Sequence, residues 1–245
     1  MTQALALPTR KDEDFRYADL AALAPLWPVA VETIAVAAGE RGSLALVLDG
    51  SEPVAREIAI TLGDGASFDL RVLNAPAAYG RVAVRVELGA GAEFTLGAAQ
   101  LAGGDQTVEI VTDVLHAHPD AISRQVVRSV AGGSATANYL GKVRVAKGAD
   151  GTDGEQSVRA MLLDRTATAN ARPELEIFAD DVKCAHGCAV GELDANSLFY
   201  MAQRGLPPEL AKRLMLQAFV AEAFTGAADE EALQAAAQAA LERLL

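Results

Sequence analysis

The chain has 245 residues, of which 51% are hydrophobic and 22% charged, with a formal net charge of −12. This charge argues against a nucleic-acid-binding surface, because contacts with phosphates require clustered Lys and Arg, and against adhesion to an anionic membrane. No stretch approaches the ~18 uninterrupted apolar residues of a membrane span, so the composition is that of an ordinary globular protein.

Residues 1–30 form a short lead that is first polar and then apolar. Prolines near both ends limit any helix in it to about Glu13–Leu23. Met1–Leu7 is too short and too weakly apolar for the core of a signal peptide, and the basic pair Arg10–Lys11 follows it instead of preceding it. With only two cysteines in the chain, we expect a cytoplasmic protein without disulfides.

Residues 31–192 are expected to form a β core. Apolar residues alternate with other residues in short runs, separated by glycine-rich segments, which is the pattern of strands with one buried face. The clearest of these runs are Leu44–Leu48, Ile58–Leu62, Val82–Val86, Val108–Val111 and Lys142–Val145.

One stretch of this core repeats itself, since Ile60–Leu70 matches Val86–Leu96. The offset between the two copies falls within the range that is typical of stacked-coil architectures. The Gly-x-Gly of each copy suits a corner where the backbone takes positive φ. We predict a β-helix (β-solenoid) whose coils bury small apolar side chains. A pair of similar hairpins in a β-sandwich is the alternative.

Residues 193–245 are expected to form three helices. The first follows Asp194, a typical N-cap residue, and ends before Gly205. The second begins at a proline pair and ends before Gly226, and the third begins at the acidic run Asp229–Glu231.

Two of these helices have an apolar stripe. The stripe of the second helix consists of Leu210, Leu214, Ala218 and Ala221. The stripe of the third consists of Leu233, Ala237, Leu241 and Leu244. Because the third helix is rich in alanine, it forms helix well but offers a weak core, and we expect it either to dock a partner or to fray.

The most distinctive chemistry lies in the segment Cys184-Ala185-His186-Gly187-Cys188. Residues two apart in a strand point to the same face, so Cys184, His186 and Cys188 would share one. Thiolate and imidazole form a soft ligand set suited to iron, zinc or copper(I). Three ligands within five residues are awkward to arrange around one ion, so another chain would have to complete the shell. The alternative is that the cysteines only fill space.

A second pair of histidines, His116 and His118, also has i, i+2 spacing. The favoured role for this pair is structural, with imidazoles bonded to backbone at a strand end, and metal binding is the lesser alternative. The sequence contains neither a Gly-x-x-x-x-Gly-Lys-Ser/Thr loop nor a Gly-x-Ser-x-Gly elbow. Any ATP hydrolysis linked to the protein would therefore come from a partner.

The segment Arg172–Gly187 closely resembles the signature of the SufB/SufD family of iron–sulfur cluster assembly proteins. Its Lys-Cys-x-His-Gly form is that of the SufD type, whereas the SufB type typically has Glu-His-Glu there. The resemblance continues in five further segments: Leu7–Tyr17, Gly141–Val145, Asp153–Gln156, Val190–Asp194 and Leu198–Gly205.

The resemblance implies a non-catalytic scaffold: a β-helix with helical ends that pairs with a SufB-type subunit and docks a SufC-type ATPase on its C-terminal helices. It implies that the nascent cluster assembles at the SufB–SufD interface, with His186 implicated and Cys184 more weakly. No tightly bound cofactor is expected, only a transient iron–sulfur cluster at that interface. The residues expected to bind SufC are Leu210, Leu214, Phe219 and Phe224.

The sequence departs from the family in two respects. The chain is much shorter than many SufD proteins, which puts a flavin-related role in doubt. Position 188 is Cys where the family usually has Ala, so Cys188 is either a neutral packing replacement, which we favour, or an extra thiol ligand. Two other functions stay open: a stand-alone metal-dependent enzyme built on Cys184, His186 and Cys188, and a purely architectural subunit with inert Cys184 and His186.

Overall fold

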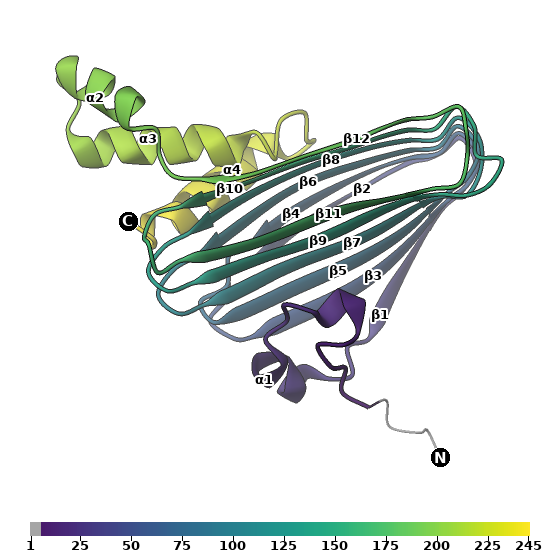
Figure 1. Cartoon of the computed structure of the whole chain (residues 1–245), viewed down its shortest axis with the longest axis horizontal. Helices are drawn as coiled ribbons and strands as arrows, with labels where there is room; N and C mark the ends of the chain where they lie inside the picture. Colours follow the sequence, from purple (N-terminus) through teal and green to yellow (C-terminus); the bar gives the residue numbers. More distant parts are fainter. Residues whose placement is uncertain (1–5) are drawn as a thin grey trace.

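The computed structural model describes residues 6–245. The first five residues of the predicted lead, which are also the first five of the segment Met1–Leu7, lie outside the described residues. The core is a flattened solenoid in which each coil contributes one strand to each of two six-stranded parallel sheets (Figure 1). The predicted β-helix is confirmed. The alternative of antiparallel hairpins in a sandwich is wrong, because every strand pairs in parallel with a strand of the neighbouring coil.

The two sheets separate odd-numbered from even-numbered strands. The first has the order β1 (Val31–Val36), β3 (Val54–Leu62), β5 (Tyr79–Leu88), β7 (Thr107–His116), β9 (Thr136–Val145) and β11 (Thr168–Ile177). The second has the order β12 (Lys183–Gly191), β10 (Asp153–Leu162), β8 (Ile122–Ala131), β6 (Glu93–Ala102), β4 (Ser67–Asn74) and β2 (Arg41–Leu48). Each of the five clearest alternating runs lies inside one of these strands.

Glycines at the corners let successive coils approach one another. Gly65 and Gly91 take positive φ (65° and 61°), as the repeat predicted. The N–H of Gly65 donates to the carbonyl of Ala90 on the next coil at 2.8 Å. A Cβ at Gly89 would lie 2.8 Å from the backbone nitrogen of Asp64, so a larger residue there would push two coils apart.

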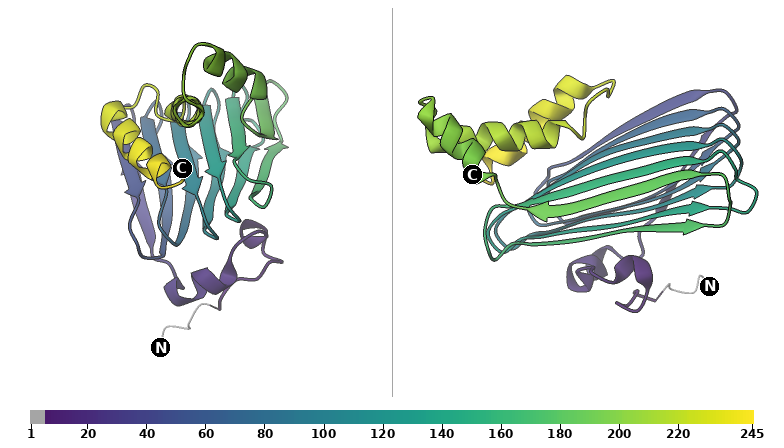
Figure 2. Two further views of the ribbon diagram at one scale, coloured as in Figure 1. Left: turned by 90° about the vertical axis from the view of Figure 1, so that its left-hand side faces the viewer. Right: turned by 45° about the horizontal axis from the view of Figure 1, so that its top comes forward.

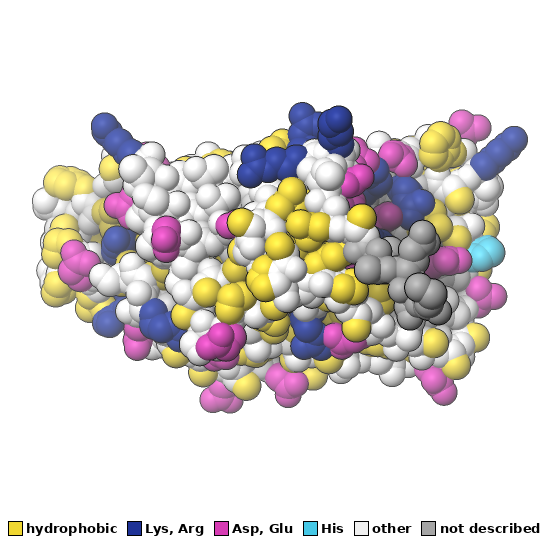
Figure 3. Space-filling model, turned by 90° about the horizontal axis from the view of Figure 1, so that it is seen from below, with side chains coloured by type: hydrophobic (Ala, Val, Ile, Leu, Met, Phe, Trp, Pro, Cys, Tyr) yellow, Lys and Arg dark blue, Asp and Glu magenta, His cyan; other side chains and the backbone are white. Residues whose placement is uncertain are grey.

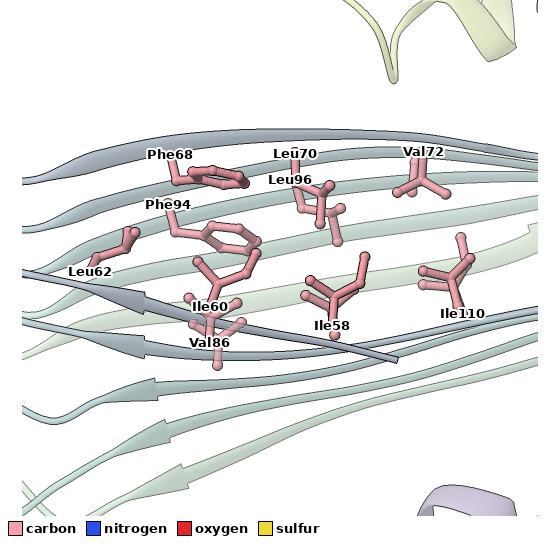
Figure 4. Close-up of a cluster of buried hydrophobic side chains, with 14 of the residues drawn as sticks. Ile58, Ile60, Leu62, Phe68, Leu70, Val72, Val86, Phe94, Leu96 and Ile110 are labelled. Atoms are coloured by element: carbon pink, nitrogen blue, oxygen red, sulfur yellow. The ribbon is translucent and has the colours of Figure 1, made fainter. Parts of the chain in front are cut away.

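Side chains from the inner faces of the two sheets meet in a closed apolar core (Figure 4). Phe68 and Phe94 stack in adjacent coils, and Ile58 and Leu96 are 2% exposed or less. Burying one such aliphatic side chain stabilises the fold by roughly 1.5–3 kcal/mol. The alternating pattern therefore folds as a solenoid because one face of each strand in the inner coils is sealed between the sheets.

The lead packs on the outer face of the odd-strand sheet (Figures 1 and 2). It consists of two 3-10 turns, η1 (Glu13–Phe15) and η2 (Ala24–Leu26), and the short helix α1 (Leu20–Leu23). The single helix expected over Glu13–Leu23 is thus broken, because the Asp19 side chain accepts the N–H groups of Ala21 and Ala22 and starts a new helix. Figure 3 shows this side of the molecule, with hydrophobic side chains gathered at its centre and charged side chains of both signs around them.

A buried ion pair fastens the lead to the sheet. Arg81 Nη1 lies 2.5 Å from Glu109 Oε2, and the two side chains are 3% and 1% exposed. Arg81 Nη2 donates to the carbonyl of Asp14 at 2.9 Å, and Glu109 Oε1 accepts the N–H of Asp19 at 2.8 Å. The guanidinium also lies 4.3 Å from the centroid of the Phe15 ring. Each charge therefore has partners that offset its loss of water.

Three helices follow β12: α2 (Ala195–Gln203), α3 (Pro208–Ala221) and α4 (Glu230–Glu242). The predicted caps of α2 and the predicted start of α3 are confirmed. Asp194 Oδ1 accepts the N–H of Ser197 at 2.7 Å, and Gly205 takes positive φ just beyond α2. Helix α3 ends earlier than expected, at Ala221 with Glu222 as its C-cap, and Gly226 lies in the turn that follows. None of the helices in residues 6–245 has the length and apolar character needed to cross a membrane.

Helices α3 and α4 lie on the outer face of the even-strand sheet, whereas α2 extends beyond the end of the strands (Figures 1 and 2). The stripe of α4 is buried at Leu233, Ala237 and Leu241, so α4 is an integral part of the fold and these three side chains are not free to contact a partner. Helix α3 instead packs through Leu216 and Val220, which leaves its predicted stripe half-buried or exposed.

Arg128 on β8 joins the helices to the sheet. Its side chain is 1% exposed, and its Nε donates to Glu222 Oε2 at 2.8 Å just after α3. Its Nη1 donates to the carbonyl of Ser157 at 2.8 Å, and its guanidinium lies 5.9 Å from the Phe219 ring. The position of α3 is therefore set by a specific polar contact as well as by apolar packing.

Candidate functional site

The last coil of the solenoid leaves one edge of each sheet unpaired. Among the described strands, β11 pairs only with β9 and β12 only with β10. In the preceding coils the inward-facing side chains are covered by the coil that follows. At β11 and β12 this cover is missing, so side chains in inward-facing positions are open to a partner.

Strand β12 brings the three candidate ligands to this open end. Cys184, His186 and Cys188 lie in register with Gly154, Gln156 and Val158 of β10. The β10 residues are buried inside the solenoid, so the β12 residues occupy the inward-facing positions of the last coil. They share one face, as the i, i+2 spacing predicted, but His186 and Cys188 are exposed and Cys184 is half-buried.

The two thiols are poor nucleophiles in the isolated chain. Burial raises the pKa of the Cys184 thiol, and burial likewise raises the pKa of the Cys188 thiol. The Cys188 Sγ lies 4.0 Å from the carbonyl of Ala171 on the facing strand. Both groups are therefore protonated at neutral pH, and their ligation of a metal would require the metal itself to displace the proton.

The geometry does not form a closed metal site within this chain. At about 3.3 Å per residue, Cys184 and Cys188 stand about 13 Å apart along β12, too far to share one ion. In residues 6–245 no three His, Cys, Asp or Glu side chains come together in a way that could hold a metal ion. The structure therefore does not favour the stand-alone metal-dependent enzyme.

His116 has the structural role that was favoured. It lies at the end of β7, fully buried, with its Nε2 2.9 Å from Ser123 Oγ. Burial lowers its pKa to about 4. A hydrogen bond with the backbone of Ala121 also acts on the imidazole, and the hydroxyl of Ser123 is a further partner that we did not expect. His118 is exposed on the corner that follows.

A row of buried polar side chains beneath His186 was missed by the sequence analysis. Gln156 Nε2 donates to the Tyr139 hydroxyl at 3.2 Å, the Tyr139 and Thr112 hydroxyls are 3.1 Å apart, and Thr112 Oγ1 donates to Gln125 Oε1 at 3.0 Å. All four side chains are buried, and burial raises the pKa of Tyr139 to about 12. The sequence shows Gln125 and Gln156 only as isolated polar residues, and the register that brings them together is visible only in the structure.

The four residues expected to bind SufC lie in different surroundings. Leu214 is exposed, whereas Leu210 and Phe219 are half-buried. Phe224 is completely buried in the core between helices and sheet, so it cannot contact a partner in this conformation. Beside Leu214, a surface groove of about 340 Å³ runs between α3 and α4, lined by Gln217, Ala218, Gln234, Gln238 and the helix core.

Comparison with known proteins identifies the family to which this solenoid and its helices correspond. The model of the family described as "SUF system FeS cluster assembly, SufBD core domain" matches residues 53–219, from the start of the solenoid's second coil to the last turn of α3. The chain belongs to the SufBD family. The resemblance seen in the sequence is thereby confirmed, and the open last coil lies within the matched SufBD core.

Several curated relatives are similar to this SufBD-family chain. Protein ABCI7, chloroplastic, of Arabidopsis thaliana is 40% identical over 119 residues, which are 48% of this chain and 25% of that protein. Iron-sulfur cluster assembly protein SufD of Escherichia coli (strain K12) is 36% identical over 108 residues, 44% of this chain and 26% of that protein. SufD of Bacillus subtilis (strain 168) is 32% identical over 118 residues, 48% of this chain and 27% of that protein. The chain thus spans about a quarter of the length of these relatives.

Proposed function

We propose that this SufBD-family chain is a SufD-type scaffold subunit that pairs with a SufB-type subunit through its last coil. The open edge formed by β11 and β12 carries the proposal. An unpaired strand edge is a ready template for pairing with another chain. Exposed apolar side chains at the same end, Ile177, Phe178 and Val190, would be covered by such a partner. The similarity to proteins named SufD supports the type of subunit.

The seam between the two subunits is the proposed place of cluster assembly. His186 and Cys184 face it from β12, and side chains of the partner would complete a ligand shell that this chain leaves open. A neutral imidazole is a suitable iron ligand at cell pH. The cluster would be transient, as the cargo of assembly. We assign Cys188 a packing role in which its thiol faces the same seam.

The groove between α3 and α4 is the proposed docking site of a SufC-type ATPase. Leu214 borders it, and Leu210 extends the same face of α3 by one turn. Phe219 would contribute through its contact with Arg128, which fixes α3 on the sheet. Because the sequence has no phosphate-binding loop, ATP hydrolysis would belong to the partner and this subunit would be non-catalytic. The reducing cytoplasm stays the predicted location.

Replacing His186 tests the proposal. We expect His186→Ala to lower cluster formation by the assembled complex about tenfold or more, since even the loss of a residue that only orients a metal ligand typically costs 10–100-fold in metal affinity or activity. Co-purification with SufB-type and SufC-type subunits should be unchanged, because the imidazole is exposed and supports no packing. The matched control is His118→Ala, which removes the chain's other exposed histidine. Wild-type cluster yield in His186→Ala would remove the proposed role.

A further inference from the structure

An unsatisfied hydrogen-bond acceptor lies directly beneath His186. Gln156 is completely buried, and its Oε1 has no hydrogen-bond partner. A buried polar atom without a partner costs about 1–3 kcal/mol, so folded proteins rarely leave one unless another group fills it. The last coil is the place where such a group can still move, because nothing in the described chain covers it.

The hydrogen bonds of the buried row fix which end of the Gln156 amide is free. Thr112 uses its only proton toward Gln125 Oε1, so the Tyr139 hydroxyl donates to Thr112 and must itself accept from Gln156 Nε2. The amide nitrogen of Gln156 is therefore engaged, and the oxygen is the atom left over. An oxygen in this position needs an N–H or O–H donor from a neighbouring coil.

Two register neighbours of Gln156 can supply this donor: Gln125 on β8, whose Nε2 also has no partner, and His186 on β12. His186 is the one on the side of the open end. It lies in register with Gln156 on the adjacent strand, where strands are about 4.8 Å apart. Its side chain occupies the same inward-facing column but is exposed, so the ring is free to turn over the Gln156 amide. Because Nδ1 is the ring nitrogen nearer to the backbone, it is the one that can reach the Gln156 amide, and Nε2 would then point toward the open end.

We propose that Gln156 is the positioning residue of His186: its Oε1 accepts the Nδ1–H of the imidazole and leaves the Nε2 lone pair directed at the subunit seam. A hydrogen bond to one ring nitrogen fixes the tautomer and the orientation of the imidazole, so the other ring nitrogen is left free to bind a metal. Histidine ligands of metals are commonly held in this way. The role of this contact in cluster assembly rests on the proposed function. Its geometry can be tested without partner or cluster.

The test is the tautomer of His186 in the full chain, read from two-bond ¹⁵N–¹H correlation spectra at about pH 8, where an unperturbed imidazole is neutral. The chain has three histidines, so His116 and His118 serve as internal references. We expect mainly the Nδ1–H form at His186, although water favours the Nε2–H form. In Gln156→Met, which keeps the chain length but removes the amide, the ratio should shift roughly fivefold toward Nε2–H, the effect of one net hydrogen bond.

The matched control is Gln100→Met. Gln100 is also a completely buried glutamine, but it hydrogen-bonds to the Asn138 carbonyl and the Ser129 hydroxyl and does not belong to the row. This control should leave the tautomer of His186 unchanged. An Nε2–H form in the wild-type protein would overturn the proposal even if Gln156→Met did not fold, because it would mean that Gln125 or water satisfies Gln156 Oε1. Equal tautomer ratios in wild type and Gln156→Met would do the same. If the proposed function failed but the Nδ1–H form were found, the positioning geometry would stand without its role in cluster assembly.

Discussion

The burial of His116 at the end of β7 couples the stability of the fold to pH. Its pKa in the folded chain is lowered to about 4 by burial, whereas an unfolded histidine titrates near 6.5. Between these values the unfolded chain binds a proton that the folded chain does not. The stabilising effect is therefore complete above about pH 6.5 and is lost as the pH falls toward 4, by on the order of 2–3 kcal/mol.

Urea unfolding at several pH values between about 7 and 4.5 measures this effect. In His116→Gln, which can keep a hydrogen bond to Ser123, the free energy of unfolding should fall less steeply over this range than in the wild type. The exposed His118 gives the matched control, since His118→Gln should keep the wild-type slope. Parallel curves for wild type and His116→Gln would show that His116 is not the titrating group.

Single residues also show which parts of the site the sequence could predict. The spacing of Cys184, His186 and Cys188 was enough to place them on one face, because strand geometry alone decides it. Their exposure was not predictable, since it depends on the absence of a further coil beyond β12. The polar row depends on the register between Gln125 and Gln156, which lie on different coils, and no local pattern shows it.

The attachment of the N-terminal lead rests on the buried pair Arg81 and Glu109. Glu109→Gln would leave the Arg81 charge buried without its counter-charge, and we expect a loss of about 3–5 kcal/mol in the free energy of unfolding. The chain offers a matched control in the more exposed pair Arg56 and Glu32 on neighbouring odd strands. There Glu32→Gln should cost about 1 kcal/mol or less. Chemical denaturation of both variants measures the difference, and similar losses would contradict the importance of burial.

The elements differ in how far the sequence predicts them. The repeat can be detected in the sequence where successive coils have equal length, as in the coil that runs from Val54 to its paired residue Gly80. Later coils are longer, and the partners Thr136 and Thr168 lie further apart in the sequence, so the period disappears although the coils continue. Helix ends are predictable because caps such as Asp194 are local. The buried face of α3 is not, because the sheet on which it packs decides which side is covered.

As a whole the molecule is a stack of coils whose strands pair only with strands of the neighbouring coils, with the β1–β2 coil at one end and the β11–β12 coil at the other. Local opening in such a stack is easiest at its ends, where strands are paired on one side only. Amide hydrogen exchange should therefore be slowest in the central strands β5 to β8. It should be faster in both end coils of the free chain.

The two ends provide an internal comparison for the proposed pairing. Adding a SufB-type subunit should slow exchange in β11 and β12 by about tenfold or more, because each bound edge amide then opens only when the interface opens, and a tenfold change corresponds to about 1.4 kcal/mol. The β1–β2 coil has the same kind of free edge but lies at the opposite end of the stack, so its exchange should not change. Protection of β1 and β2 instead would place the partner at the opposite end from His186. Protection at neither end would mean that binding does not use the strand edges at all.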